Sequence, residues 1–271
     1  MASSKPQVRG IIFDWAGTTV DYGCFAPTMV FVEGFRAHGV EITLAEARTP
    51  MGLHKRDHIA AVLALPRVRD AWAAVHGAAP TDADVQHVYD DFAPRQIAVI
   101  AQYATPIPGV VETVAALQAR GLKIGSTTGY TRAMLDALMP VAAAQGYEPD
   151  ASVAADEAPA GRPAPWMAFM NAMKLNIYPM TALVKVGDTP ADIAEGLNAG
   201  MWAVGIAKTG NELGMTAAEV DALDAADLRA RLAPIYQRLS QAGAHYVIDS
   251  VADLPPLLDD IERRLAAGEK P

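Results

Sequence analysis

The sequence predicts an α/β protein in which helices cover a doubly wound parallel sheet and an all-helical segment is inserted after the first strand. An apolar run at residues 8–13 indicates a buried first strand. From residue 104 onward strand-like and helix-like segments alternate, which is typical of a parallel sheet. Residues 22–103 carry helical signals only. We therefore expect a core domain made of residues 1–21 and 104–271, and a helical cap domain made of residues 22–103.

The composition excludes several classes of function. A net charge of -9 argues against nucleic acid and membrane surfaces as partners. The single cysteine, Cys24, excludes an intrachain disulfide and a cysteine zinc cluster, and it fits a reducing compartment. Residues 1–10 do not resemble a secretory signal, and no run approaches the roughly 18 apolar residues of a membrane span. We expect a cytoplasmic protein.

The first strand is expected to deliver a carboxylate, Asp14, to its C-terminal end. In open α/β sheets, ligands bind beyond the carboxyl ends of the strands. An aspartate after an apolar run is also a common helix cap or turn residue. Asp14 therefore gains a functional meaning only if other segments bring matching chemistry to the same edge.

Helices in the inserted segment are predicted from their start and stop signals. Residues 25–35 are apolar nearly all round, so this helix is expected to be buried on most sides. It packs either in the core of the segment itself or partly against another subunit. Further helices are expected after the capping box at residues 43–46, from residue 51 to Pro66, and from Thr81 toward Tyr103.

In the remaining chain the alternation is regular. Strands are expected at residues 122–127, 151–153, 182–186, 201–206 and 245–248. Helices are expected at residues 109–120, from 132, at 163–175, 189–198 and 250–267.

Four of the predicted βα connections carry polar side chains. The set is Asp14, Thr128, Arg162, Asp188 and Asp192. In a parallel sheet all of them gather at one edge. Neighbouring carboxylates repel unless a hard cation neutralises them, and Mg²⁺ prefers oxygen ligands. A hydroxyl, the backbone amides around Gly129 and a guanidinium would hold phosphoryl oxygens. A carboxylate that faces such a site can act as a nucleophile toward phosphorus.

In this order and spacing, these residues resemble the four motifs of the haloacid dehalogenase superfamily of phosphotransferases, which have a Rossmann-type core. The helical insertion after strand one is similar to one cap class of that superfamily. The resemblance implies that Asp14 attacks phosphorus and that Mg²⁺ bridges Asp14 and Asp188. It also implies that Thr128 and Arg162 hold the phosphoryl group and that Asp192 supports the loop.

One position departs from the pattern of ordinary phosphatases in that superfamily. These enzymes carry a second aspartate two residues after the nucleophile, and it protonates the oxygen of the leaving group. Ala16 occupies this position and offers a metal only its backbone carbonyl. Either the enzyme is a poor phosphatase, or its leaving group is not an oxygen.

The helical insertion contains a candidate for the missing chemistry, Lys55. Alone, its stretch at residues 51–58 is more often a solvated helix face, and the pair His54 and His58 lacks a third zinc ligand. With residues 13–27, 125–132 and 159–167, however, this stretch resembles the phosphonatase family of the superfamily over almost the whole chain.

This resemblance implies hydrolysis of phosphonoacetaldehyde to acetaldehyde and phosphate, in the breakdown of 2-aminoethylphosphonate. Lys55 would form an imine with the aldehyde, so that the electrons of the breaking P–C bond pass to an iminium. His58 is a candidate proton shuttle. Candidates for binding the substrate are Gly129, Tyr130, Met51 and Cys24. The implied assembly is a homodimer through the cap.

Two alternatives remain at this point. The first is a capped phosphatase or dehalogenase of the same superfamily that acts on another small substrate. The second is a non-enzymatic phosphoacceptor similar to response-regulator receiver domains, against which the long insertion with Lys55 argues. A dinucleotide-binding module is not supported, because no G-x-G-x-x-G follows the first strand.

Overall fold

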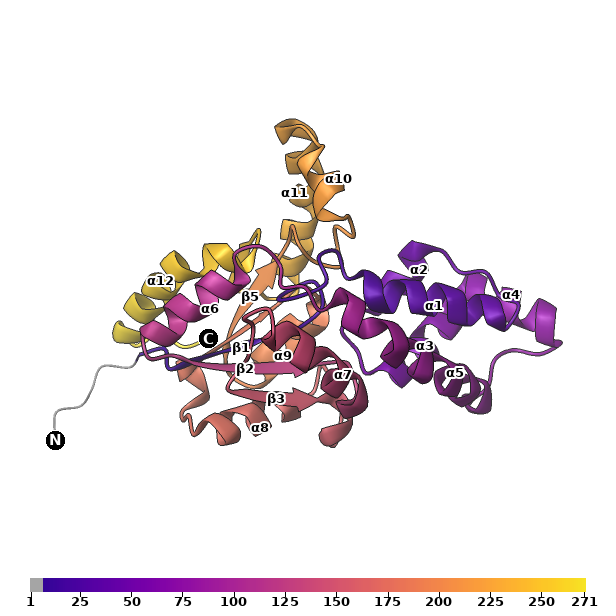
Figure 1. Cartoon of the computed structure of the whole chain (residues 1–271), viewed down its shortest axis with the longest axis horizontal. Coiled ribbons are helices and arrows are strands. Elements are labelled where there is room, and N and C mark those ends of the chain that lie inside the picture. Colours follow the sequence, from indigo (N-terminus) through magenta and orange to yellow (C-terminus); the bar gives the residue numbers. More distant parts are fainter. Residues whose placement is uncertain (1–6) are drawn as a thin grey trace.

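A computed structural model describes residues 7–271. The prediction that residues 1–10 are not a secretory signal falls mostly on residues 1–6, which lie outside the described residues. The described chain contains a parallel sheet of six strands in the order β3-β2-β1-β4-β5-β6 (Figure 1). The strands are β1 (Gly10–Phe13), β2 (Lys123–Thr128), β3 (Ala151–Ala154), β4 (Leu183–Gly187), β5 (Trp202–Ile206) and β6 (Tyr246–Ile248). The predicted doubly wound sheet is confirmed.

The first strand lies at the centre of the sheet. Ile12 is in register with Gly125 of β2 on one side and with Lys185 of β4 on the other. The chain fills the β2 side first and the β4 side afterwards, so the strand order switches next to β1. In such sheets this switch point is where ligands bind.

Helices cover both faces of the sheet. One face lies under α6 (Val110–Ala119), α7 (Arg132–Ala143) and α12 (Leu254–Ala266), whose apolar side chains pack with Phe13, Ile124 and Val186. The opposite face lies under α8 (Trp166–Leu175), α9 (Pro190–Asn198) and α11 (Ala225–Gln241), with the short α10 (Ala217–Asp221) before α11. The result is a three-layer sandwich.

Residues 25–100 form a helical lobe beside the sheet (Figure 1). Its helices are α1 (Phe25–Ala37), α2 (Leu44–Arg48), α3 (Lys55–Ala64), α4 (Pro66–His76) and α5 (Asp82–Ile100). The predicted capping boxes begin α2 at Thr43 and α5 at Thr81. No strand occurs in this part of the described chain, as predicted.

The apolar helix α1 is covered within the chain itself. Val30, Phe31 and Phe35 are buried, and α1 packs on α2 and α5. The helix therefore packs in the lobe's own core, and contact of its exposed part with another subunit stays a prediction.

Three helix predictions need correction. Pro66 does not merely end a helix but occupies the first turn of α4, where its fixed φ and missing N–H are tolerated. The helix predicted from Pro163 begins at Trp166. Helices α10 and α11 were not predicted, although Leu228, Leu232, Ile235 and Leu239 mark an apolar stripe at helical spacing in α11. No helix among residues 7–271 has the length and apolar character needed to cross a membrane.

Candidate active site

Side chains from the sheet edge and from the helical lobe line one shared cavity. Its lining is Asp14, Ala16, Cys24, Pro27, Met51, Gly52, Lys55, Thr128, Gly129, Tyr130, Arg162, Asp188 and Thr189. The structure therefore brings together every predicted site residue except His58 and Asp192. The cavity has a volume of about 20 Å³, room for about one water molecule. The lobes must part, or side chains must move, to admit a substrate.

Asp14 follows β1 directly and is held at the end of the strand. Its backbone N–H donates to Val186 O at 2.9 Å, and the Thr19 hydroxyl donates to its carbonyl at 3.0 Å. The side chain accepts from Arg162 Nη2 at 2.8 Å and is 6% exposed. Burial and the neighbouring Asp192 raise the pKa of Asp14, against the effect of Arg162.

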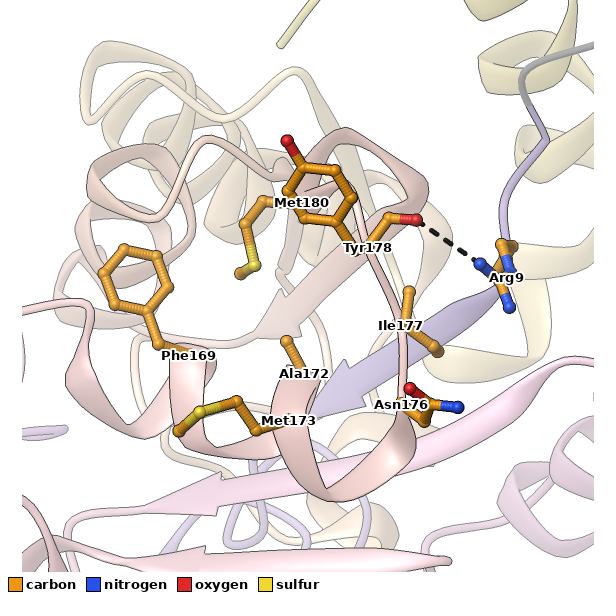
Figure 2. A pocket seen from close by; sticks show the side chains of 8 residues that line it. All are labelled: Arg9, Phe169, Ala172, Met173, Asn176, Ile177, Tyr178 and Met180. Atoms are coloured by element: carbon orange, nitrogen blue, oxygen red, sulfur yellow. Dashed lines mark hydrogen bonds between the residues drawn. The ribbon is translucent and has the colours of Figure 1, made fainter.

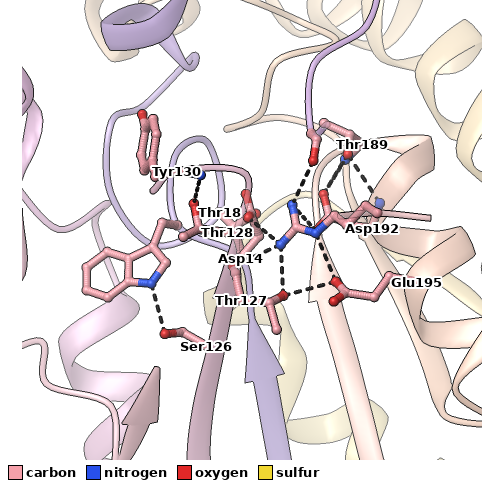
Figure 3. A network of polar contacts seen from close by, with 12 residues as sticks. Asp14, Thr18, Ser126, Thr127, Thr128, Tyr130, Thr189, Asp192 and Glu195 are labelled. Carbon is pink, nitrogen blue, oxygen red and sulfur yellow. Dashed lines mark hydrogen bonds and ion pairs between the residues drawn. The ribbon is translucent and has the colours of Figure 1, made fainter. Parts of the chain in front are cut away.

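Arg162 is the centre of a buried ionic network. Figure 3 shows its acidic partners Asp14, Asp192 and Glu195. Besides Asp14, its guanidinium pairs with Asp192 Oδ1 at 2.9 Å and Glu195 Oε2 at 2.9 Å. Nη2 also donates to Thr127 O at 2.8 Å. The protein's own acceptors thus satisfy all three nitrogens. Arg162 is therefore placed to orient Asp14, and its contact with a phosphoryl group stays a prediction.

Lys185 of β4 completes this network from a fully buried position. Its ammonium lies 2.8 Å from Asp192 Oδ1 and 3.3 Å from Glu195 Oε2, and it donates to Thr127 Oγ1 at 3.0 Å. Asp192 also accepts from the Thr189 hydroxyl at 2.6 Å, which closes a capping box at the start of α9. These contacts match the predicted role of Asp192 as a support of the loop.

Asp188, at the end of β4, is fully buried and faces Asp14. Its carboxylate accepts from the Thr18 hydroxyl at 3.2 Å and from the Asn211 N–H at 2.6 Å. Gly17, with a φ of 83°, lets its loop approach: a Cβ there would lie 2.4 Å from Asp188 Oδ2. Burial and repulsion by Asp14 raise the pKa of Asp188 well above its usual range.

Carboxylate oxygens of Asp14, Asp188 and Asp192 lie within 4.8 Å of one another, so the cluster could hold a metal ion. Counting Glu195, four buried carboxylates face two paired cations, Arg162 and Lys185. Counted in their ionised forms, the carboxylates exceed the cations by two charges in this buried cluster. A divalent cation would neutralise this excess, so the residues present fit a metal.

The Thr128 end of β2 forms the opposite wall. The Thr128 hydroxyl accepts from the Tyr130 N–H at 3.1 Å. Gly129 lies directly under the lobe, since a Cβ on it would come within 2.3 Å of Leu53 O. Any larger residue at position 129 would push the two lobes apart.

Lys55, at the start of α3, is 3% exposed. Its Nζ lies 4.9 Å from the centre of the Tyr130 ring and 5.6 Å from that of Phe31. Within residues 7–271 the ammonium makes no ion pair closer than 4.0 Å. Desolvation lowers the pKa of Lys55 to about 8. Burial raises the pKa of the Cys24 thiol well above its usual range, so the thiol is neutral near pH 7 and offers Lys55 no counter-charge.

His58 lies one helical turn from Lys55 but does not line the cavity. The ring is fully buried, stacks on Phe31 at 3.9 Å, and its Nε2 lies 2.8 Å from Ala47 O. Burial lowers the pKa of His58 well below its usual range, so the ring is neutral. The role of His58 as a proton shuttle stays a prediction.

Sequence reasoning missed several polar residues of the site, among them Thr189, which lines the cavity, and Lys185, Glu195 and Asn211 behind it. A lysine inside an otherwise apolar strand was a usable signal, because a buried charge requires a partner. Glu195 follows Asp192 by three residues and shares its helix face, which was also readable. Asn211 lies in a loop that carries no comparable pattern.

Comparison with known protein families shows the class of enzyme to which the chain belongs. Residues 8–200, which span β1, the helical lobe and helix α9 with Asp192, match the family model of the haloacid dehalogenase-like hydrolases. The chain belongs to that class of hydrolases.

Comparison with individual relatives identifies one family within this class. A phosphonoacetaldehyde hydrolase of Bacillus cytotoxicus is 52% identical over 258 residues, 95% of this chain and 98% of that protein. A phosphonoacetaldehyde hydrolase-like protein of Syntrophobacter fumaroxidans is 51% identical over 98% of this chain and 96% of its own. A solved structure of such a protein from Oleispira antarctica has a TM-score of 0.96 at 42% identity, with both chains covered completely. Within that class, the chain belongs to the phosphonoacetaldehyde hydrolase family.

Proposed function

We propose that this protein hydrolyses the P–C bond of phosphonoacetaldehyde and releases acetaldehyde and phosphate. The observation that carries the proposal is the meeting of Asp14 and Lys55 in one small cavity, with Ala16 where a phosphatase would need an acid. The names of relatives that are about half identical over nearly the full length support the same substrate.

Lys55 activates the substrate in the proposed reaction. Its neutral amine adds to the aldehyde carbon, water leaves, and a protonated imine forms. Asp14 then attacks phosphorus, the P–C bond breaks, and its electron pair moves into the iminium to give an enamine. Protonation of the enamine at carbon and hydrolysis of the resulting imine release acetaldehyde and restore the amine. Water then frees phosphate from the aspartyl phosphate.

Mg²⁺ is the metal that we propose for the acidic cluster, held by Asp14, Asp188 and the Ala16 carbonyl. When bound, it neutralises the buried charge and polarises the phosphoryl oxygens. Asp192 is left to support the loop, because both of its oxygens already accept from the protein.

Phosphoryl oxygens are proposed to contact the Thr128 hydroxyl and the Gly129 backbone amide. Arg162 orients Asp14. Once the substrate has entered, Arg162 is proposed to lie next to its phosphoryl group. Met51, Cys24 and Tyr130 are proposed to surround the aldehyde end, where their apolar surfaces keep Lys55 dry and its pKa low.

We propose that residues 22–103 form a cap that moves as a domain over the core formed by residues 1–21 and 104–271. The nearly closed cavity supports this division, because a rigid chain would not admit substrate. A cytoplasmic location and a place in 2-aminoethylphosphonate breakdown complete the proposal, and a free, buried Cys24 is consistent with a reducing compartment.

We also propose a homodimer. Two surfaces are candidates for its interface, one on the cap and one on the core. Most of the apolar side of α1 is covered within the chain, but Met29 of this helix is 38% exposed on the cap. Met173 and Tyr178 are 73% and 83% exposed beside α8, where they line an open groove (Figure 2). Sedimentation of Met29→Glu and Met173→Glu would assign the interface to the cap or to the core, and a monomeric wild type would contradict the dimer.

The substrate assignment is tested with a matched pair of compounds. Phosphonoacetaldehyde and glycolaldehyde phosphate share the aldehyde and the phosphoryl group, but only the second has an ester oxygen as leaving group. Because no acid faces that oxygen, we expect release of phosphate from the ester to be slower by about a hundredfold or more. Equal rates for both compounds would favour a capped phosphatase instead.

A further inference from the structure

Arg48 connects the helical lobe to the sheet domain at a place away from the catalytic cavity. It ends α2, and its guanidinium reaches the loop that follows β5. Nη1 lies 3.2 Å from Asn211 Oδ1, and Nη2 lies 3.4 Å from Gly214 O. The fit is close, since a Cβ on Gly214 would lie 2.9 Å from the guanidinium carbon.

The contact between Arg48 and Asn211 runs in both directions. While the guanidinium donates to the amide oxygen, Asn211 Nδ2 donates to the Arg48 carbonyl at 3.2 Å. Asn211 is 2% exposed, so these bonds are shielded from water. Both of them span the boundary between the lobe and the core.

The same guanidinium also contacts residues 22–24, the first connection between the core and the lobe, which we call the hinge. Nη1 donates to Gly23 O at 2.6 Å, and the group lies 5.0 Å from the centre of the Phe25 ring. Gly23 in turn donates its N–H to Thr209 O at 2.8 Å. Arg48 therefore joins the lobe, the hinge and the loop after β5 in one cluster.

Asn211 links this cluster to the acidic site. Its backbone N–H donates to Asp188 Oδ2 at 2.6 Å. The preceding residue, Gly210, lies so close that a Cβ on it would come within 2.4 Å of Asp188 Cβ. A displacement of Asn211 therefore changes the hydrogen bonding of the proposed metal ligand.

We propose that Arg48 and Asn211 form a clasp that couples closure of the lobe over Lys55 to the position of Asp188. Opening the lobe breaks both bonds of the clasp and frees the loop that carries Asn211; closing it restores them and fixes the donor to Asp188. Neither residue touches the cavity, so both are positioning residues. The inference rests on the proposed function for the identity of the site, but the closure itself can be measured without substrate.

The first test is the chemical accessibility of Lys55 in the full-length protein, with neither substrate nor Mg²⁺. Acetic anhydride labels accessible amines, and peptide mass spectrometry gives the rate at residue 55. We expect Arg48→Ala and Asn211→Ala each to accelerate labelling of Lys55 by about tenfold, the effect of losing one hydrogen bond to a charged group. The double variant should be accelerated by less than the product of the two single effects, because the two side chains share one hydrogen bond, from Arg48 Nη1 to Asn211 Oδ1.

A matched control is Arg36→Ala, since Arg36 is an exposed arginine of the same lobe whose side chain, within residues 7–271, pairs with Glu41 alone. Its labelling of Lys55 should equal that of the wild type. Unchanged labelling in the Arg48 variant, or multiplied effects in the double variant, would overturn the clasp. If Asn211→Ala does not fold, Arg48→Gln, which keeps a polar side chain but lacks the guanidinium fork, decides on the same readout.

The second test addresses the link to Asp188. The Mg²⁺ concentration that half-saturates phosphate release should rise several-fold in Arg48→Ala, whereas Arg36→Ala leaves it unchanged. A lower kcat with an unchanged Mg²⁺ requirement would contradict the coupling. If the protein proves inactive on phosphonoacetaldehyde, the proposed function fails while the labelling result still judges the clasp.

Discussion

Lys55 is the residue whose surroundings decide the chemistry. It lies among the Tyr130 and Phe31 rings, where an ammonium loses hydration without gaining a carboxylate partner. Its lowered pKa of about 8 gives an appreciable neutral fraction near pH 7, whereas an exposed lysine near 10.4 would be almost wholly charged. The position supports a nucleophilic amine.

A pH dependence follows from this shift. Only the neutral amine adds to the aldehyde, so the rate of imine formation should rise from pH 6 and level off above pH 8. Between pH 6 and the plateau the expected increase is about a hundredfold, because one pH unit changes the neutral fraction tenfold. Borohydride trapping at short times measures this rate. A rate that still rises steeply at pH 9.5 would mean an amine with an ordinary pKa.

Elements of the lobe and the sheet meet at glycines where no side chain would fit. Gly129 follows β2, and its missing Cβ lets the Leu53 carbonyl of the lobe come close. Gly129→Ala should therefore leave the core folded but hold the lobe off the sheet. We expect kcat/KM to fall by about a hundredfold, the usual cost of a misplacement of about 1 Å.

The thermal midpoint of Gly129→Ala should stay close to that of the wild type, because the clash lies between the lobes and not in either core. Gly121→Ala serves as a control for stability: Gly121 has a φ of 83° but open space around it. That variant should lose stability and keep its activity. Full activity in Gly129→Ala would contradict the closed arrangement as the active one.

The sequence predicts an element when a local pattern of residues indicates it, and it misses contacts between residues that are far apart in the chain. Asp14 and Asp188 follow mostly apolar strands and Thr128 ends a strand bounded by Gly121 and Gly129, so the sheet edge could be predicted from local pattern. The helix α4 was missed because Pro66 was interpreted as a stop signal although it also suits a first turn. The clasp of Arg48 and Asn211 could not be predicted, since it joins residues 163 positions apart that carry no local pattern.

At the scale of the whole molecule, the buried charge is the dominant feature. The excess of carboxylates over Arg162 and Lys185 lies between the two lobes, so its neutralisation affects both. Removal of divalent cations with EDTA should abolish phosphate release, and Mg²⁺ should restore it. Mg²⁺ should also raise the thermal midpoint of the wild type, since a ligand of the folded state stabilises it by mass action.

The matched control for the metal is Asp188→Asn, which keeps the size of the side chain and removes one charge. Its thermal midpoint should respond little to Mg²⁺, whereas that of the distant Asp221→Asn should respond like the wild type. An equal response of Asp188→Asn would place the cation elsewhere.

The central claim is that Lys55 forms an imine with the substrate while Asp14 takes the phosphoryl group. The most direct measurement is borohydride reduction of the protein with phosphonoacetaldehyde, followed by peptide mapping, in the wild type, Asp14→Asn and Lys55→Arg. The account predicts one reduced adduct at Lys55 in the wild type, the same adduct without phosphate release in Asp14→Asn, and neither adduct nor turnover in Lys55→Arg. Turnover that persists in Lys55→Arg, or an adduct on a different lysine, would contradict it.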